Sequence, residues 1–379
     1  MEGSCGMKAP DANRLVVQLF RSYYKRLRED DIYVNDLQKR EFAFTYFTEG
    51  GMRRHIAFGS TSELVRYLAE AVPRHAYHSA AYYRDPAART MDDKGWEGAD
   101  LIFDIDVDHI DTPCKEQHDK WFCRACGSTG WGAPSRCPSC GSENLEKHTW
   151  VCNVCISVAR DEILKLVDFL ERDFGFTSHD LFITFSGHRG FHVRVENEEV
   201  RMVSQDGRRE IVDHIKGLGL DIKQMVVKTA GGYRLRYGMP VSGWYGRIAR
   251  WSILTTEEEK PVLSLEEWEK LLSECVAKEA VAIDERVTVD TKRLIRLPNS
   301  LHGKTGLRVA PLTVQDLENE DLLGKAKVFR DGEVAVEFEN EPPKTVLDIS
   351  STASSRTLPL YAAVYMLLNG VSFSKFVLL

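Results

Sequence analysis

The chain carries the sequence LIFDIDV at residues 101–107, in which apolar and acidic side chains alternate. Successive side chains of a β-strand point to opposite faces, so a strand here places Asp104 and Asp106 on one face. The other face carries the side chains that can pack into a core: Leu101, Phe103, Ile105 and Val107. Two adjacent carboxylates repel each other unless a cation lies between them, and Mg²⁺ or Mn²⁺ prefers such oxygen ligands. The stretch therefore predicts a strand with a divalent-metal site, against the plainer alternative of a surface strand whose acids face water.

Seven of the nine cysteines lie between residues 114 and 155, which indicates a metal-binding module. Six of them form three C-x-x-C pairs, a spacing that suits tetrahedral Zn²⁺; buried or redox cysteines are the alternative. The spacing predicts a zinc ribbon held by Cys123, Cys126, Cys137 and Cys140. A second Cys₃His site, enclosing the ribbon as an insertion, is predicted from Cys114, His118, Cys152 and Cys155. Both ions would be structural, because four protein ligands close the coordination shell.

The segment SGHRGFH, residues 186–192, is predicted to join two strands at 181–185 and 191–195. It offers a hydroxyl, two imidazoles and a guanidinium within one hairpin, from Ser186, His188, His192 and Arg189. Arginine binds phosphate oxygens in a bidentate manner, so this set suits a polyphosphate. Taken alone, a hairpin of this composition is also consistent with a surface turn that binds nothing.

The stretch from Ala282 to Arg308 adds a third group of polar residues. Asp284 is a candidate third carboxylate for the metal site, and Asp290 is the competing candidate. The alternative role of Asp290 is to cap residues 291–297 or to form a salt bridge with them. Positive charge for the same phosphates is expected from Arg296, His302 and Lys304. A basic loop that faces nucleic acid is the plainer interpretation of the whole stretch.

Apolar periodicity predicts the helices of the chain. They are expected at 12–29, 62–71, 156–174, near 209–217, 265–279 and 359–369, with a Ser/Thr-rich linker at 346–357. The 379 residues carry a net charge of −7, yet the stretches 207–250 and 286–308 are basic, which fits contact with a phosphate backbone. The sequence lacks an apolar run long enough to span a bilayer, so a soluble intracellular protein is expected.

Four motifs occur in the order found in the catalytic small subunit of archaeal and eukaryotic DNA primase. They are DIDVD at 104–108, the cysteine-rich module, SGHRGFH at 186–192 and RLIRLPNSLHGKTG at 293–306. Over about residues 20–310 the chain resembles this family, and its archaeal branch most. The resemblance implies an α/β (α+β) primase catalytic fold with a two-sheet active-site cleft, an inserted zinc-binding module and a small helical subdomain. The expected divisions are the N-terminal part of the catalytic domain with the metal-binding strand (1–108), the zinc-binding insertion (109–155), the remainder of the catalytic domain with the helical subdomain (156–345), and a linker and C-terminal helix (346–379).

The resemblance also implies synthesis of short RNA primers, and possibly DNA primers, on single-stranded DNA by two-metal-ion nucleotidyl transfer, with release of pyrophosphate. The family's metal-binding acids match Asp104, Asp106 and Asp284. Its phosphate-binding residues match Ser186, Arg189, His192, Arg296, His302 and Lys304, whereas His188 occupies a variable position. The implied cofactors are two Mg²⁺ or Mn²⁺ ions and one or two structural Zn²⁺ ions; the additional ribbon departs from the family's simplest pattern of one zinc site.

The implied partners are a large regulatory subunit, the template, NTPs or dNTPs and other replication proteins, without a membrane, in an archaeal cytoplasm near the nucleoid. Two other functions remain open on the sequence. One is a repair-type primase-polymerase that extends primers without starting them, and the other is a non-catalytic zinc-ribbon module that binds nucleic acid. A metal-dependent nuclease is a weaker alternative, because a nuclease does not need a triphosphate clamp.

Overall fold

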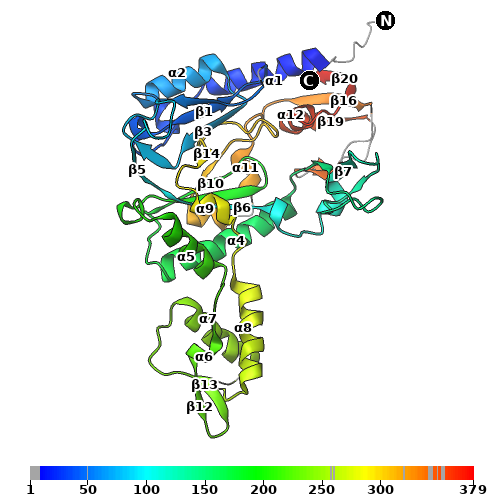
Figure 1. The fold of residues 1–379 in the computed structure, drawn as a ribbon. Coiled ribbons are helices and arrows are strands. Elements are labelled where there is room, and N and C mark those ends of the chain that lie inside the picture. The colour runs from blue at the N-terminus through cyan, green and yellow to red at the C-terminus, as the bar shows by residue number, and fades with distance from the viewer. Residues whose placement is uncertain are drawn as a thin grey trace, which may run out of the picture.

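Two four-stranded β-sheets form the main body, one above the other in Figure 1. The computed structural model describes residues 9–48, 50–256, 258, 261–318, 321–339, 345–347, 349–350 and 355–379. The upper sheet has the order β14-β3-β1-β2, with strands at Leu294–Arg296, His75–Ser79, Phe42–Thr45 and Arg53–Ile56. The lower sheet has the order β15-β10-β11-β6, with strands at Pro311–Leu312, Leu181–Phe185, Gly190–Val195 and Leu101–Asp106. The predicted mixed α/β class is confirmed, and so is the strand at the DIDVD motif.

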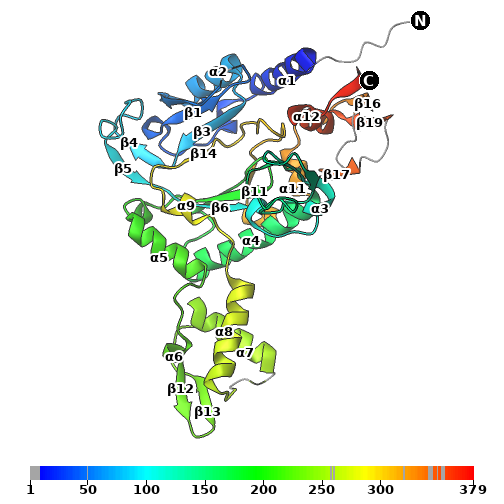
Figure 2. The same ribbon diagram turned by 45° about the vertical axis from the view of Figure 1, so that its right-hand side comes forward.

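Helices cover the outer sides of the two sheets (Figures 1 and 2). Above the upper sheet lie α1, Ala9–Tyr24, and α2, Thr61–Ala71, and the ring of Tyr67 lies 4.9 Å from that of Phe44 in β1. Helix α2 begins where its sequence predicts, because the side chain of Ser60 accepts a hydrogen bond from the backbone N–H of Glu63. Below the lower sheet runs α4, Asn153–Arg172.

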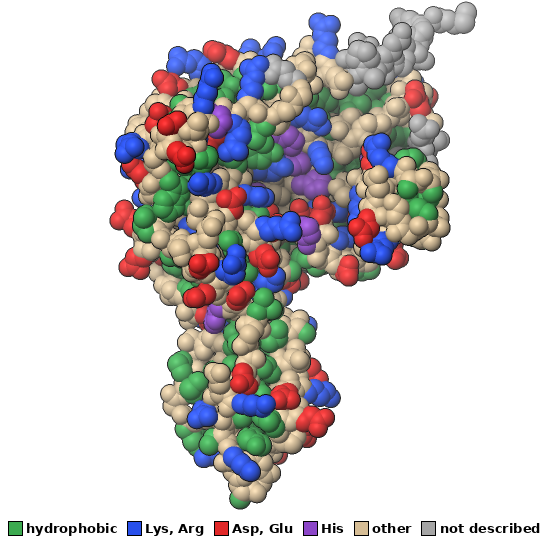
Figure 3. Space-filling model, viewed as in Figure 1, with side chains coloured by type: hydrophobic (Ala, Val, Ile, Leu, Met, Phe, Trp, Pro, Cys, Tyr) green, Lys and Arg blue, Asp and Glu red, His purple; other side chains and the backbone are tan. Residues whose placement is uncertain are grey.

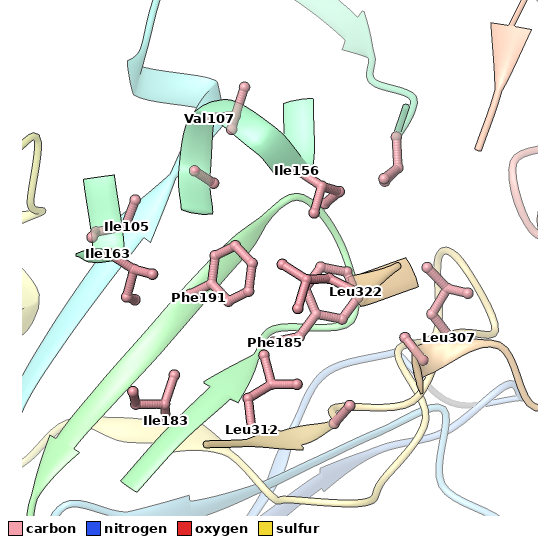
Figure 4. Packing of buried hydrophobic residues seen from close by; sticks show 14 of the residues in the cluster. Ile105, Val107, Ile156, Ile163, Ile183, Phe185, Phe191, Leu307, Leu312 and Leu322 are labelled. Atoms are coloured by element: carbon pink, nitrogen blue, oxygen red, sulfur yellow. The ribbon is translucent and has the colours of Figure 1, made fainter. Parts of the chain in front are cut away.

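The apolar face of β6 packs into the core as its alternation predicts. Leu101, Phe103 and Ile105 are fully buried. Figure 4 shows Ile105 near Ile163 of α4 and Phe191 of β11, with further apolar side chains from β10 and α11. Because this face of β6 packs into the core, the opposite face, which carries the aspartates, points into the space between the two sheets.

A separate three-stranded sheet holds the cysteine-rich segment. Its order is β8-β7-β9, with strands at Thr129–Trp131, Lys120–Cys123 and Leu145–His148, and the short helix α3, Lys115–His118, precedes it. A second small unit extends downward from the main body in Figures 1 and 2. It contains α6 (Ile222–Met225), β12 (Val226–Thr229), β13 (Gly232–Leu235), α7 (Gly243–Thr256) and α8 (Leu265–Glu279). Helix α8 matches its predicted range, and the unit is the predicted helical subdomain with a hairpin added.

The C-terminal segment is more ordered than its Ser/Thr-rich sequence predicts. Part of the predicted linker forms strands, namely β17 (Thr345–Val346), β18 (Ile349–Ser350) and β19 (Ser355–Pro359), while residues 348 and 351–354 of it lie outside the described residues. Strand β19 joins β16 (Glu333–Phe338) and β20 (Phe373–Leu378) in a sheet of order β19-β16-β20. The predicted last helix is α12, Leu360–Leu368, and the hydroxyl of Tyr365 accepts a hydrogen bond from the backbone of Val151 at 3.0 Å.

Short elements connect these units. They are η1 (Glu29–Asp31), η2 (Leu37–Lys39), β4 (Ala81–Tyr83), β5 (Trp96–Ala99), η3 (Val107–His109), η4 (Glu198–Val200), α5 (Gln205–Ile215), α9 (Glu285–Val289), α10 (Val314–Leu317) and α11 (Leu322–Ala326). Among the described helices, none combines the length and apolar character needed to cross a bilayer.

A buried polar network joins the two sheets. Arg40, which precedes β1, forms an ion pair with Asp100, which precedes β6, at 2.7 Å. Arg194 of β11 lies 3.8 Å from the same carboxylate and 2.9 Å from Nε2 of His78 in β3. All four residues are buried. Removing one partner of such a pair leaves an uncompensated charge, so the network fixes the position of one sheet relative to the other.

Strand β11 approaches β6 closely at Gly190. A Cβ atom at this position would lie 2.2 Å from the carbonyl oxygen of Ile105. We expect Gly190→Ala to lower the free energy of unfolding by about 1–3 kcal/mol, the usual cost of overpacking, because the strands must separate. Urea denaturation measures the change. Gly50→Ala is the matched control, since a Cβ there meets nothing within 4 Å; equal stability of the two variants would contradict the prediction.

Candidate active site

A cavity of about 410 Å³ opens between the two sheets. Its described lining consists of His75, Tyr77, Asp104, Asp106, Asp108, Thr149, Ser186, His188, His192, Val287, Arg293, Leu294, Ile295, Arg296, His302 and Lys304. Figure 3 shows histidine and basic side chains gathered at the centre of this face, with acidic side chains next to them. The cavity therefore has an acidic part on the lower sheet and a basic, histidine-rich part around it.

The acidic part is built by the pairing of β6 with β11. Asp104 lies opposite His192 and Asp106 opposite Gly190, and Nε2 of His192 is 3.6 Å from Oδ1 of Asp104. Burial, together with the nearby carboxylates of Asp106 and Asp284, raises the pKa of Asp104 to about 7. Burial and the carboxylate of Asp108 also raise the pKa of Asp106. Such carboxylates gain most from a divalent cation, which offsets both the burial and the repulsion.

The structure separates the two candidates for a third carboxylate. The backbone N–H of Asp284 donates to the carbonyl oxygen of Asp104 at 2.9 Å, and its side chain caps α9 by accepting from the N–H of Arg286. Asp284 therefore lies beside Asp104, although the described cavity lining does not include its side chain. Asp290 accepts from the N–H of Lys292 and lines a different cavity, between α5 and α9. This contact is the capping role that the sequence analysis names as the alternative for Asp290.

Five of the six residues expected to bind phosphate line the cavity. They are Ser186, His192, Arg296, His302 and Lys304, and His188 joins them. The rings of His188 and His302 stack with centroids 5.3 Å apart. Burial and the charge of Arg189 lower the pKa of His188 to about 3, and burial and the charge of Arg296 lower the pKa of His192 to about 3. These imidazoles are thus neutral at pH 7 without a ligand.

Arg189 is the exception in this set. Its guanidinium is buried and binds two carboxylates, those of Asp108 and Asp119, and it is not part of the described lining of the cavity. The expectation that this side chain faces a phosphate therefore differs from the observed geometry. The physical reason is the buried carboxylate of Asp119, which lies outside every quoted motif and pairs with the guanidinium at 2.9 Å.

Eight residues of the described lining were not assigned from the sequence, and His75, Tyr77 and Arg293 are three of them. Nδ1 of His75 accepts a hydrogen bond from Arg296 at 2.9 Å and another from the backbone N–H of Gly303 at 3.2 Å. His75 thereby orients the arginine and the turn that carries His302 and Lys304. The sequence feature that could have identified His75 and Tyr77 is the segment HAYHS at 75–79. In a strand, these alternate positions place the histidine and the tyrosine on one face.

Both predicted cysteine sets come together. In each set, the four ligand atoms lie within 4.8 Å of one another. In the first, Sγ of Cys155 is 3.5 Å from Sγ of Cys114 and 3.4 Å from Nε2 of His118. In the second, the sulfur distances are 3.7 Å for Cys123 and Cys140 and 3.6 Å for Cys126 and Cys137. The donor types and their clustering fit a metal ion in each site.

Comparison with known proteins agrees with the resemblance. The family model described as DNA primase small subunit matches residues 139–314. The DNA primase small subunit PriS of Pyrobaculum islandicum is 36% identical over 362 residues, which cover 94% of this chain and 98% of the relative. That of Methanothrix thermoacetophila is 33% identical over 414 residues, covering 93% and 96%. A solved structure that aligns with this chain is the polymerase domain from Mycobacterium tuberculosis ligase D in complex with DNA. The alignment covers 83% of this chain and 84% of that chain, with a TM-score of 0.36 and 9% identity, and this likeness is too distant to support an argument.

The similarity to the curated relatives extends along nearly the whole length of both proteins and exceeds 30% identity. The chain belongs to the DNA primase small subunit family.

Proposed function

We propose that this chain is the catalytic subunit of a DNA primase and synthesises short RNA primers, and DNA primers, on single-stranded DNA. One observation carries the proposal. A pair of half-buried carboxylates and a wall of arginine, lysine and histidine side chains face one cavity. A nucleoside triphosphate with its divalent ions presents the matching charges, positive toward the aspartates and negative toward the basic wall.

Asp104 and Asp106, with Asp284 beside them, would hold two Mg²⁺ or Mn²⁺ ions. Bound there, these ions supply activation of the attacking 3′-hydroxyl and stabilisation of the charge on the transferred and departing phosphates. Arg296 and Lys304 bind the β- and γ-phosphates, while Ser186 and the neutral imidazoles of His192 and His302 donate hydrogen bonds to their oxygens. Because these groups are held by strands β11 and β14 and by the turns at 186–189 and 302–306, they orient the triphosphate before reaction, and catalysis is mostly positioning and electrostatics.

The cysteine sets and the partners complete the proposal. We propose Zn²⁺ for both sites, because Cys₄ and Cys₃His sets are typical of closed, structural zinc coordination. The relatives are named as small subunits, and we propose that this chain likewise assembles with a large subunit, alongside other replication proteins in an archaeal cytoplasm near the nucleoid. NTPs and dNTPs are the proposed substrates.

The decisive test is synthesis on unprimed single-stranded DNA with Mg²⁺ or Mn²⁺. We expect short products from the wild type and a loss of roughly 10²–10³-fold or more in Asp104→Asn, the scale of removing one electrostatic contact to a transition state. Asp290→Asn is the matched control and should retain activity, since Asp290 faces another cavity. Extension only from a supplied primer would favour a repair-type polymerase. Full activity of Asp104→Asn would refute the proposed site.

Arg296 gives a second test, directed at the phosphates. A charge-assisted hydrogen bond contributes about 1.5–3 kcal/mol, so Arg296→Met should raise the nucleotide KM by roughly 10- to 150-fold with a smaller change in kcat. Steady-state kinetics on a primed template separate the two constants. Lys292→Met removes an exposed charge outside the described cavity lining and should leave KM unchanged. A similar KM in both variants would show that Arg296 does not bind the triphosphate.

Metal binding should depend on pH through Asp104. Its pKa of about 7 means that protons compete with the cation below neutral pH. We expect Mn²⁺ affinity to rise about tenfold per pH unit up to about pH 7 and then to level off, as measured by electron paramagnetic resonance of free Mn²⁺. Because the folded-state pKa lies above the ordinary 3.8, the metal-free protein should also lose stability as the pH rises between these values. A pH-independent Mn²⁺ affinity from pH 5 to pH 8 would contradict this assignment.

A further inference from the structure

A continuous series of polar contacts, buried up to Arg189, connects the Cys114 metal site to the end of the strand that carries the catalytic aspartates. Nδ1 of His118 lies 2.7 Å from Oδ1 of Asp119. Both carboxylate oxygens of Asp119 accept from Nη1 of Arg189, at 3.0 and 2.9 Å. Nε of Arg189 then donates to Oδ1 of Asp108 at 2.5 Å. His118, Asp119 and Arg189 are each about 1% exposed, so water does not compensate for the loss of a contact among these three, whereas Asp108 at the end of the series is exposed.

The geometry of His118 fits a metal ligand with an outer partner. Its Nε2 faces the sulfur of Cys155 at 3.4 Å, while its Nδ1 faces Asp119. Metal-binding histidines commonly donate their other N–H to a carboxylate, which fixes the ring orientation and the tautomer. Asp119 is fixed in turn by the backbone N–H of Trp150, at 3.0 Å, two residues before Cys152.

Arg189 is attached to the metal-binding strand by backbone as well as side chain. Its carbonyl oxygen accepts from the N–H of Val107 at 3.2 Å, and the next residue, Gly190, pairs with Asp106. The guanidinium holds Asp108, two residues after Asp106, from the same side. The segment Asp106–Asp108 therefore has two attachments to Arg189, whose buried charge depends on Asp119 for its compensation.

We propose that Asp119 and Arg189 are positioning residues that couple metal binding at the Cys114, His118, Cys152 and Cys155 site to the placement of Asp106 and Asp108. A metal-bound His118 fixes Asp119, Asp119 fixes Arg189, and Arg189 fixes the end of β6 where the catalytic cations bind. Arg189 thus holds the segment Asp106–Asp108 from outside the cavity and does not contact the triphosphate. The metal-binding role of Asp106 in this coupling rests on the proposed function, whereas the link between Asp119 and the cysteine site does not.

The test compares Asp119→Asn with Asp111→Asn, a matched change of an exposed acid in the same module. Zinc release from the full chain to a metallochromic chelator is followed in time, with one phase for each zinc. We expect Asp119→Asn to accelerate one phase by roughly 10- to 100-fold and to leave the other phase unchanged, as is usual when an outer partner of a ligand is lost. The same variant should bind Mn²⁺ about tenfold more weakly. Asp111→Asn should change neither quantity.

A second variant keeps the inference testable if Asp119→Asn does not fold. Arg189→Lys retains the charge but not the bidentate geometry, and should accelerate the same zinc-release phase. Unchanged zinc release in Arg189→Lys, together with a raised nucleotide KM, would overturn the inference and make Arg189 a phosphate ligand. Zinc release can be measured without primer synthesis, so a failed zinc-release prediction overturns the inference and leaves the proposed function standing. A wild type that makes no primers but shows the expected zinc phases would overturn only the proposed function.

Discussion

The antiparallel pairing of β6 with β11 is the constraint on which the rest of the site depends. Its register places Asp104 opposite His192 and Asp106 opposite Gly190, so the carboxylates and the hairpin between β10 and β11 share one sheet. A slip of one residue would turn every side chain of β6 to the other face and bury the aspartates against α4. The apolar face of β6 excludes that slip, because Phe103 and Ile105 are fully buried. The absence of a side chain at Gly190 lets the strands approach, since any Cβ would meet the carbonyl of Ile105.

The second constraint is the distance between the two sheets. The upper sheet contributes His75, Tyr77 and Arg296, which complete the basic wall only if it stays above β6. The ion pair of Arg40 with Asp100 crosses between the sheets directly before β1 and β6. Buried ion pairs add little net stability compared with apolar packing, but they strongly disfavour any arrangement that separates the charges. This pair therefore specifies the geometry of the cavity more than it stabilises the fold.

The sequence predicts the elements and half of the site because both depend on local pattern. Alternation in 101–107 and helical spacing in 265–279 locate β6 and α8, and the C-x-x-C spacing assembles both cysteine sets. The partners of Arg189 do not follow from pattern, because Asp119 lies 70 residues away in a loop and pairs only after β11 and the cysteine module have folded together. The same holds for His75, which meets Arg296 across 221 residues. Asp284 and Asp290 each cap a short segment, and they are distinguished by tertiary structure, because Asp284 contacts the backbone of Asp104 and Asp290 lines a different cavity.

The electrostatics of the whole cavity indicate the kind of ligand it can bind better than any single residue does. Asp104 has a raised pKa, and His188 and His192 have lowered pKa values, so burial holds both kinds of group near their neutral forms. A cation alone would ionise the aspartates but increase the positive field on the imidazoles, and an anion alone would do the reverse. A ligand that carries divalent cations on one side and phosphates on the other relieves both at once. A metal-bound polyphosphate neutralises both parts of the cavity, and the nucleoside triphosphate that we propose as the substrate is a ligand of this kind.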